Sequence, residues 1–411
     1  MNIALLGFGT VGKGVFNILK RNKTDHFNLK YILIKKYKKK FLSEMTSNIK
    51  DILQDPELNI VIEVMGGLEP AHTYILEALR HRKNVITANK AVIALYLKEF
   101  NSVAYQNHVK FYFESSVGGG IPWIQGLERA LRIDKIRKIQ GIFNGTSNFI
   151  LDQMKFNKQT FSEVLTKAQK LGYAEKDPSS DIEGFDIANK LCINIDIAYN
   201  IFLPPQKKLP ISGIQNVSLE DISFFQKLGL VIKLVGKSKR IGDKFDYAVE
   251  PTLFAPNTLE ANTFDNYNLI TLSGKTIGNL RFVGQGAGQL PTANAVIQDA
   301  LDIFQHKNHL KRNFQSSLSF NPNLIKKNYL LKTKVDPRFL PGFFANFLGR
   351  YFLFKDTSTE DMHKLLQNIL PYDSQAFIAC FNSEDLNFNN SRKQENRHKI
   401  FQIINKTASL K

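Results

Sequence analysis

Two short patterns in the sequence carry residues whose types and spacing could do chemistry. The first, Gly7-Phe8-Gly9-Thr10-Val11-Gly12, follows the apolar run at residues 2–6 and opens a helix-like pattern. In a strand–loop–helix unit, the first glycine permits a tight turn and the second lets backbone amides approach a pyrophosphate. The third allows close packing of helix against strand, and the positive end of the helix favours the anion. The pattern predicts dinucleotide binding by these six residues, and the alternative is a structural glycine turn.

The second pattern is Asp186 and Lys190, four residues apart on a predicted helix and therefore on one face of it. As an exposed ion pair they would contribute roughly a few tenths of a kcal/mol and have no function. In a closed cleft, the same pair could orient an alcohol and move its proton, which oxidation by NAD(P)⁺ requires. The spacing alone leaves both interpretations open.

The residues that follow the second predicted strand bear on the choice of dinucleotide. That strand, Tyr31 to Ile34, runs into Lys35 and Lys36, where an Asp or Glu usually binds the ribose 2′-hydroxyl of NAD. Ammonium groups at this place favour a 2′-phosphate, so the sequence predicts NADP, with NAD as a possible cofactor. The alternative is that these lysines only face solvent.

Apolar runs alternate with helix-like stretches over the first 130 residues. This alternation predicts an α/β domain with a Rossmann-type, doubly wound parallel sheet. The expected strands are residues 2–6, 29–34, 60–64, 84–87 and 109–113, and the expected helices are 11–20, 49–53, 71–80 and 91–106.

Strands and helices are interleaved less regularly after residue 130. We expect an α+β substrate-binding and dimerisation domain over residues 131–306, a linker over 307–328 and a smaller α+β domain over 329–411. The expected strands are 136–142, 231–235, 247–253, 268–274, 329–335, 352–355 and 376–380. The expected helices are 161–171, 185–200, 291–305 and 392–406, and a further helix is expected to start over residues 341–347.

Composition excludes several classes of protein. The chain has 411 residues, 43% hydrophobic and 22% charged, which is ordinary for a globular protein. Its formal charge of +18 is mostly spread along the sequence, and the longest basic cluster, residues 35–40, is short and follows a predicted strand, so no nucleic-acid partner is expected. The first residues lack the basic region of a signal peptide, so none is expected, and no apolar run is long enough to predict a membrane span. Cys192 and Cys380 form no C-x-x-C pair, which fits a reducing compartment and predicts a cytoplasmic protein.

Seven stretches, in order along about the first 305 residues, resemble homoserine dehydrogenase. They are residues 62–71, 85–91, 114–122, 141–150, 168–178, 181–190 and 284–288. The resemblance implies reversible NAD(P)-dependent interconversion of L-homoserine and L-aspartate 4-semialdehyde, in threonine and methionine biosynthesis. The partner it implies is a small-molecule substrate.

The resemblance also implies roles for individual residues. Lys190 corresponds to the proton donor of the reduction direction and Asp186 to a residue that orients the substrate. Lys90 resembles the family's lysine between nicotinamide and substrate, and Glu175 and Asp181 resemble acidic contacts to the substrate's ammonium group. Turn capping is the alternative for these two acidic residues.

Further positions match backbone or cation contacts of the family. Gly172 matches a position beside the substrate, Gly288 a contact near the nicotinamide, and Asn144-Gly145-Thr146 a polar loop between the two. The family's monovalent-cation site, expected to hold sodium, would take the carboxylate and carbonyls of Glu114, Val117, Gly119 and Ile121. A glycine-rich hinge is the other interpretation of that last segment.

The C-terminal part resembles the family less clearly. Residues 336–345 are similar to the opening of an ACT domain, a βαββαβ module that binds an effector, but the polar stretch at 387–392 departs from that pattern. We therefore expect a degenerate ACT-like fold and leave feedback by threonine open. The chain resembles the monofunctional form of the family, and family members form dimers, so a homodimer or a dimer of dimers is expected.

Two other classes compete with this interpretation. Dehydrogenases of the same two-domain design, such as the aspartate-semialdehyde and dihydrodipicolinate enzymes, share the glycine loop; the former uses a cysteine nucleophile, but Cys192 lies in an apolar helix. A dinucleotide-binding sensor without catalytic activity would be expected to lack Lys90, Asp186 or Lys190, and all three are present.

Overall fold

The chain divides into two compact units in a computed structural model, and each unit is described separately. The first comprises Met1–Ile136, Asn189–Gln206 and Leu272–Ser317, and the second comprises Arg137–Ala188, Lys207–Thr271 and Leu318–Lys411. The structure describes residues 1–21, 26–36, 38, 40–205, 210–310, 313–340, 344–348 (backbone only) and 350–382.

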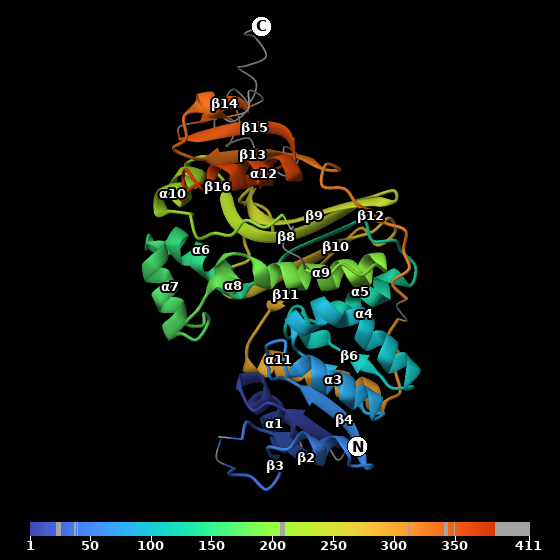
Figure 1. Ribbon diagram of the computed structural model, residues 1–411. Coiled ribbons are helices and arrows are strands. Elements are labelled where there is room, and N and C mark those ends of the chain that lie inside the picture. Colours follow the sequence, from blue (N-terminus) through green and yellow to red (C-terminus); the bar gives the residue numbers. More distant parts are fainter. Residues whose placement is uncertain are drawn as a thin grey trace. The chain divides into compact units, whose positions relative to one another are not determined.

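The first unit contains a six-stranded sheet in which every neighbouring pair of strands runs parallel (Figure 1). Its strands, in spatial order, are β3 (Met45–Thr46), β2 (Asn28–Leu33), β1 (Asn2–Leu6), β4 (Leu58–Glu63), β5 (Asn84–Thr87) and β6 (Phe111–Tyr112). The order reverses between β1 and β4, and ligands of doubly wound sheets bind beyond the carboxyl ends of the strands at such a point. The predicted fold class of this region is confirmed.

The helices of the first unit lie along this sheet and bury its aliphatic side chains. They are α1 (Thr10–Arg21), α2 (Ile49–Leu53), α3 (Ala71–Arg80), α4 (Lys90–Gln106), α5 (Trp123–Leu131) and α11 (Gln289–Phe304). Ile3, Leu5 and Ile62 of the sheet and Val296 of α11 belong to one buried core cluster. Helix α11 therefore completes the unit that begins almost 290 residues earlier in the chain.

Close packing of α1 against α11 requires a glycine. A Cβ atom on Gly14 would lie 2.5 Å from the carbonyl oxygen of Gln289 and 2.9 Å from the Cβ of Ala293. No larger residue fits there without separating the two helices. The unit also contains the 3-10 turn η1 (Glu114–Ser116) and strand β11 (Asn279–Gln285).

The second unit is built on a mixed sheet. Its strands, in spatial order, are β10 (Tyr267–Ser273), β7 (Lys138–Ile142), β8 (Val231–Ile241), β9 (Lys244–Phe254), β16 (Phe377–Phe381), β13 (Lys326–Lys332), β15 (Tyr351–Ser358) and β14 (Phe344–Leu348). The strand β12 (Ser319–Phe320) pairs with β9, and β8 and β9 form an antiparallel hairpin along their full length.

The helices of the second unit, apart from a four-residue one, begin with a side-chain cap. They are α6 (Gly145–Asn157), α7 (Phe161–Lys170), α8 (Ser179–Ile182), α10 (Leu219–Lys227) and α12 (Thr359–Ile369). Thr160 and Ser218 each form a capping box, in which side chains and backbone amides at the helix start bond reciprocally. Helix α9 (Phe185–Tyr199) is continuous, and the boundary between the units falls after Ala188.

The C-terminal part differs from the expectation at residues 344–347 and at α12, a helix that was not expected. The start of a helix predicted at residues 341–347 is wrong for 344–347, because Phe344–Leu348 forms β14 and pairs antiparallel with β15. The strands β13, β15 and β16 instead pack against α12, whose Met362 and Leu366 are buried with them. The helix expected at 392–406 lies outside the described residues, and an ACT-like fold stays a prediction.

The predicted division into consecutive domains at 1–130, 131–306 and 329–411 also stays a prediction. The expected linker at 307–328 is partly wrong, because it contains β12 and the start of β13. Within the part of the chain that the structure describes, no helix is both long and apolar enough to cross a membrane.

Candidate active site

The glycine loop lies between β1 and α1, at the point where the strand order reverses. Leu6, the last residue of β1, pairs with Leu33 of β2 and with Glu63 of β4. The loop therefore leaves the sheet between the carboxyl ends of both neighbouring strands, which is where a dinucleotide phosphate is expected.

Each glycine of the loop meets a different steric requirement. Gly7 has a φ of +103°, and its N–H donates to the carbonyl of Leu33 at 3.1 Å. A Cβ on Gly12 would lie 2.3 Å from the carbonyl oxygen of Gly7, so helix and strand can pack only because that atom is missing. Around Gly9 nothing lies within 4 Å of the Cβ position. Phe8, Thr10 and Val11 complete the loop, whose open side at Gly9 gives a phosphate access to the backbone.

The end of β2 places Lys35 and Lys36 beside this loop. The strand ends at Leu33, and both lysines are exposed. No Asp or Glu lies between Ile34 and Lys40. Tyr37 and Lys39, which follow in the sequence, lie outside the described residues.

Lys90 is positioned by a chain of hydrogen bonds that begins at a buried carboxylate. Glu63, at the end of β4, accepts from the Thr87 hydroxyl at 2.6 Å, and Thr87 in turn accepts from the backbone of Asn89 at 3.0 Å. Asn89 caps α4 and donates to the carbonyl of Gly67 at 2.7 Å. Lys90, half-buried, is the first residue of α4. Burial raises the pKa of Glu63, and sequence reasoning assigned it no role.

The segment with Glu114, Val117, Gly119 and Ile121 forms a tight loop before α5. The Glu114 carboxylate accepts from the backbone amides of Ile124 at 2.8 Å and Gln125 at 2.9 Å. Burial raises the pKa of Glu114 to about 7. A Cβ on Gly119, whose φ is +58°, would lie 2.6 Å from the backbone of Gly286.

These residues fit the predicted cation. Burial disfavours the charged form of a carboxylate, and a nearby cation stabilises that form. One carboxylate together with backbone carbonyls provides the oxygen ligands that a hard cation prefers. Gly288 lies in the glycine-rich stretch at residues 284–288, which also contains Gly286. It has a φ of +123° and caps the start of α11, the helix that packs against α1.

In the second unit, the side chain of Asn144 joins two of the predicted carboxylates. Its amide nitrogen donates to Asp181 at 2.6 Å and to Asp186 at 2.8 Å. Its amide oxygen accepts from the backbone of Ser147 and so caps α6. The polar loop predicted at Asn144-Gly145-Thr146 therefore includes the start of a helix, and the bridging role of Asn144 was not predicted.

The predicted substrate residues Gly172 and Glu175 lie in the loop after α7. Gly172 has a φ of +75°, and both residues are exposed. The hydroxyl of Thr146 donates to the carbonyl of Tyr173 at 2.7 Å, which ties this loop to the start of α6. The side chain of Gln169 donates to the carbonyl of Glu175 at 3.1 Å.

Asp186 and Lys190 lie one turn apart on α9, as the sequence predicts. Both are buried, with 3% and 7% of their surfaces exposed, so a solvated ion pair is excluded. The side chain of Asn194 donates to the carbonyl of Lys190 at 2.8 Å and accepts from the indole N–H of Trp123. Cys192, also on α9, is buried and free, which agrees with its interpretation as a core residue.

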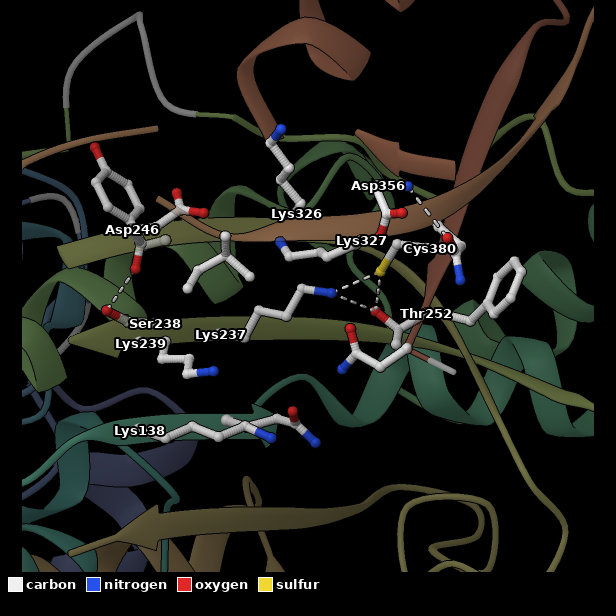
Figure 2. A pocket seen from close by; sticks show the side chains of 16 residues that line it. Lys138, Lys237, Ser238, Lys239, Asp246, Thr252, Lys326, Lys327, Asp356 and Cys380 are labelled. Carbon is white, nitrogen blue, oxygen red and sulfur yellow. Dashed lines mark hydrogen bonds between the residues drawn. The ribbon is translucent and has the colours of Figure 1, made fainter. Parts of the chain in front are cut away.

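A cavity of the second unit contains none of the predicted site residues. It encloses about 330 Å³ and is lined by β7, β8, β9, β13 and β16 (Figure 2). Lys237 points into it and contacts Cys380 at 2.6 Å and Glu250 at 3.0 Å, while Lys327 contacts Glu250 at 3.1 Å. The cavity is basic because Lys138, Lys239 and Lys326 also line it.

Comparison with known proteins gives a consistent result over most of the chain. The family model of the homoserine dehydrogenase NAD-binding domain matches residues 7–114, and that of homoserine dehydrogenase matches residues 122–301. The homoserine dehydrogenase of Bacillus subtilis is 38% identical over 320 residues, covering 74% of this chain and 73% of that protein. That of Synechocystis is 39% identical over 317 residues, with 74% and 73% covered.

A solved structure agrees with these sequences. The homoserine dehydrogenase of Thiobacillus denitrificans is 30% identical and superposes with a TM-score of 0.80, covering 93% of this chain and 98% of that one. The similarity therefore extends through both units.

Proposed function

This chain belongs to the homoserine dehydrogenase family, and we propose that Lys190, Asp186 and Lys90 are the side chains on which its reaction depends. It is an NAD(P)-dependent oxidoreductase that acts on the CH–OH group of homoserine, interconverting L-homoserine and L-aspartate 4-semialdehyde in amino-acid biosynthesis. The proposal concerns how its residues do this.

Lys190 is the proposed proton donor in the reduction direction. The bound dinucleotide supplies a hydride to the carbonyl carbon, so the carbonyl oxygen must gain a proton. Lys190 is buried, and its backbone is fixed by Asn194. A fixed ammonium group can donate that proton, and its neutral amine can accept it in the oxidation direction.

The observation that carries the substrate assignment is the double hydrogen bond from Asn144 to Asp181 and Asp186. One amide brings two carboxylates together, and carboxylates so close favour a cation between or beside them. The ammonium group of an amino acid is such a cation. Asp181, with Glu175, is proposed to bind this ammonium group, and Asp186 to orient the hydroxyl.

Lys90 and two glycines complete the proposed site. The capped start of α4 supports Lys90 as a contact to both nicotinamide and substrate. Gly172 and Gly288, both with positive φ, are proposed to present backbone groups to the substrate and the nicotinamide respectively. Side chains there would be strained as well as obstructive.

NADP is the proposed cofactor, with NAD as the alternative. The support is the exposed Lys35 and Lys36 at the end of β2, together with the lack of an acidic residue there. Ammonium groups bind a 2′-phosphate, whereas a carboxylate would repel it.

A monovalent cation, sodium by the family resemblance, is proposed at Glu114, Val117, Gly119 and Ile121. The cation would neutralise the charge of the Glu114 carboxylate. The hydrogen bonds described above for this carboxylate come from backbone amides, which carry no charge. These residues would hold it through one carboxylate and three carbonyl oxygens.

The larger-scale predictions are kept as proposals. We propose a homodimer or a dimer of dimers. The domains would be a dinucleotide domain over 1–130, a substrate and dimerisation domain over 131–306 and an ACT-like domain over 329–411. We also propose a cytoplasmic location. The last is supported by two cysteines that are both free and buried.

The experiment that tests the catalytic proposal is reduction of L-aspartate 4-semialdehyde, followed as loss of NADPH absorbance. Lys190→Ala should lower kcat by roughly 100-fold or more, as loss of a proton donor implies. Lys98→Ala, which removes an exposed lysine from α4, is the matched control and should leave kcat unchanged. Unaffected turnover in the folded Lys190→Ala variant would contradict the assignment.

A further inference from the structure

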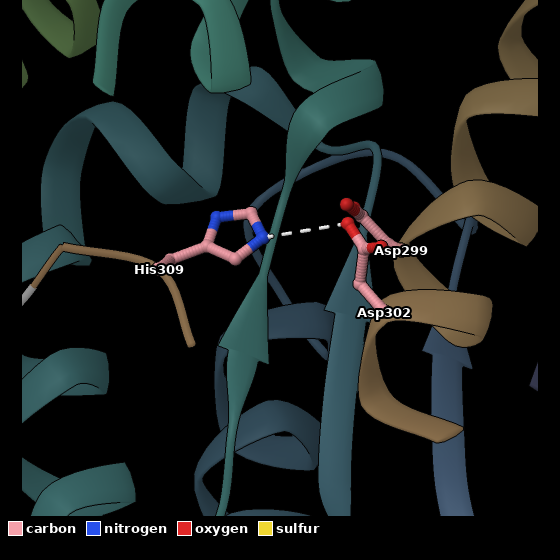
Figure 3. Close-up of side chains that lie close together, drawn as sticks. All are labelled: Asp299, Asp302 and His309. Atoms are coloured by element: carbon pink, nitrogen blue, oxygen red, sulfur yellow. Dashed lines mark ion pairs between the residues drawn. The ribbon is translucent and has the colours of Figure 1, made fainter. Parts of the chain in front are cut away.

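We propose that Asp299, Asp302 and His309 of the first unit form a binding site for a divalent transition-metal ion (Figure 3). None of these residues is assigned above to the dinucleotide, the substrate or the monovalent cation. The inference does not depend on the reaction, because it concerns binding of an ion and its test measures binding.

The three side chains converge from one helix and the segment that follows it. Asp299 and Asp302 are three residues apart near the end of α11 and therefore lie on one face. His309 follows that helix and turns back toward it, as Figure 3 shows. The potential ligand atoms all lie within 4.8 Å of one another, and Nε2 of His309 is 3.8 Å from an Asp302 oxygen.

The imidazole of His309 is oriented as a metal ligand usually is. Its Nδ1 lies 3.1 Å from a carboxylate oxygen of Glu128, which leaves Nε2 directed at Asp302. Metal-binding histidines nearly always engage a carboxylate or carbonyl through the other ring nitrogen. The ring also stacks on Tyr112 at 3.9 Å, and the Tyr112 hydroxyl donates to the carbonyl of Lys307, so the segment is held from two sides.

An independent observation is a carboxylate oxygen without a partner inside the cluster. Asp299 is fully buried; its Oδ2 accepts from the backbone of Glu114 at 2.9 Å. Its Oδ1 is buried and has no hydrogen-bond partner among the residues that the structure describes. A buried charged oxygen without a donor is costly, and coordination to a cation removes that cost.

The local charge also favours a cation. Glu114 donates its backbone amide to Asp299, and Glu128 and Asp302 both lie near His309, so four buried carboxyl groups are gathered around the cluster. Against them the described contacts show His309 and Lys307, and the Lys307 side chain is 60% exposed although it contacts Asp302 at 2.9 Å. A divalent ion would offset this excess more completely than an ammonium group that is largely in water.

The site is accessible and separate from the Glu114 carboxylate. A cavity of about 980 Å³ is lined by Asp302 and His309, so an ion can reach both. Both oxygens of Glu114 accept backbone amides from the start of α5, so this carboxylate is not counted among the ligands of the divalent ion. One imidazole nitrogen and two carboxylates are ligands typical of zinc or manganese, at distances of about 2.0–2.2 Å.

The test begins with the full-length chain, treated with EDTA and dialysed. Zn²⁺ and, separately, Mn²⁺ are titrated by calorimetry, and a single saturable site per chain is expected for at least one of them. Anomalous diffraction at the metal edge from soaked crystals of the same protein should place the ion between Asp299, Asp302 and His309. Lack of saturable binding of both ions, or an ion located elsewhere, overturns the proposal.

Variants separate ligands from the residue that orients them. His309→Gln and Asp299→Asn should each weaken binding by at least about 100-fold, and Glu128→Gln by about 10- to 100-fold, the range for residues that hold a ligating histidine. His306→Gln, three residues earlier, is the matched control and should bind as the native chain does. Equal affinity in the native chain and in the folded His309→Gln variant contradicts the site; if a variant fails to fold, the diffraction result on the native chain decides.

Discussion

The glycine loop of the first unit and the Asn144 group of the second unit differ in what their residues contribute. In the loop, Gly7, Gly9 and Gly12 act by lacking side chains, so that backbone can pack closely and present amides. Around Asn144, one amide holds the carboxylates of Asp181 and Asp186, which we propose to act through their charge. The first region should therefore be sensitive to added volume and the second to altered charge or hydrogen bonding.

The largest effect is expected from removing the amide that joins the two carboxylates. Asn144→Leu keeps the side-chain size but leaves Asp181 and Asp186 without their shared donor. Loss of a hydrogen bond to charged groups that are wholly or partly buried costs about 1–3 kcal/mol, which corresponds to a fall in kcat/KM of about 5- to 150-fold. Steady-state kinetics with homoserine measures it. Asn157→Leu, at the end of α6 and exposed, is the control, and equal kcat/KM values for both variants would refute the role of Asn144.

Charge sensitivity away from the site can be measured at Asp246 of β9. Burial raises the pKa of Asp246 to about 6, from the ordinary value of 3.8. The folded state therefore holds its proton more tightly than the unfolded state. The contribution of this group to the free energy of unfolding falls as pH rises from about 4 to about 6, by no more than about 3 kcal/mol.

Asp246→Asn should remove that decline. Urea unfolding at several pH values measures the difference between variant and native chain, and Asp243→Asn, exposed in the same hairpin, should follow the native curve. If the Asp246→Asn curve runs parallel to the native one between pH 4 and 6, the buried carboxyl does not titrate as inferred.

Added volume in the glycine loop should act on stability first. Gly12→Ala places a methyl group 2.3 Å from the carbonyl oxygen of Gly7, so helix and strand must separate. Overpacking of this kind costs about 1–3 kcal/mol. Gly9→Ala, with nothing within 4 Å of its Cβ position, is the matched comparison and should unfold like the native chain. Equal stability of the two variants would show that close packing does not explain Gly12.

The smallest effect is expected at the end of β2. Replacing Lys35 and Lys36 by alanine should reduce the ratio of kcat/KM with NADPH to that with NADH by about tenfold, or about 1.4 kcal/mol, because two charged contacts to a 2′-phosphate are lost. The ratio should not change in Lys98→Ala. If the ratio is unaltered in the double variant, the two lysines only face solvent and do not contact the cofactor.

Local patterns were sufficient to predict the parts of the fold that depend on neighbours in sequence. The strands of the first sheet other than β3, the glycine loop and α9 follow from apolar periodicity and turn residues, whereas the two-residue β3 was not predicted. Helix α12 was missed, although Ser358 as its cap and Glu360 and Asp361 in its first turn are sequence signals of a helix start. The error at Phe344–Leu348 has another cause, because that segment forms a strand by pairing with β15.

The parts of the site that were not predicted depend on contacts between distant residues. Asn144 meets Asp181 and Asp186 about 40 residues later, and Glu63 meets Thr87 across two strands. The packing of α11 on α1 joins segments that no periodic pattern relates. The resemblance to a family implied the proposed site residues, whereas the hydrogen bonds that position them became visible only in the folded chain.

The most direct test of the difference between the two regions is a crossed measurement on Gly9→Ala and Asp181→Asn. The dissociation constant of NADPH is measured by fluorescence without substrate, and KM for homoserine is measured at saturating cofactor. The account predicts that Gly9→Ala weakens NADPH binding and leaves KM for homoserine unchanged, whereas Asp181→Asn raises that KM and leaves NADPH binding unchanged. An effect of Asp181→Asn on NADPH binding alone, or of Gly9→Ala on the homoserine KM alone, would contradict it.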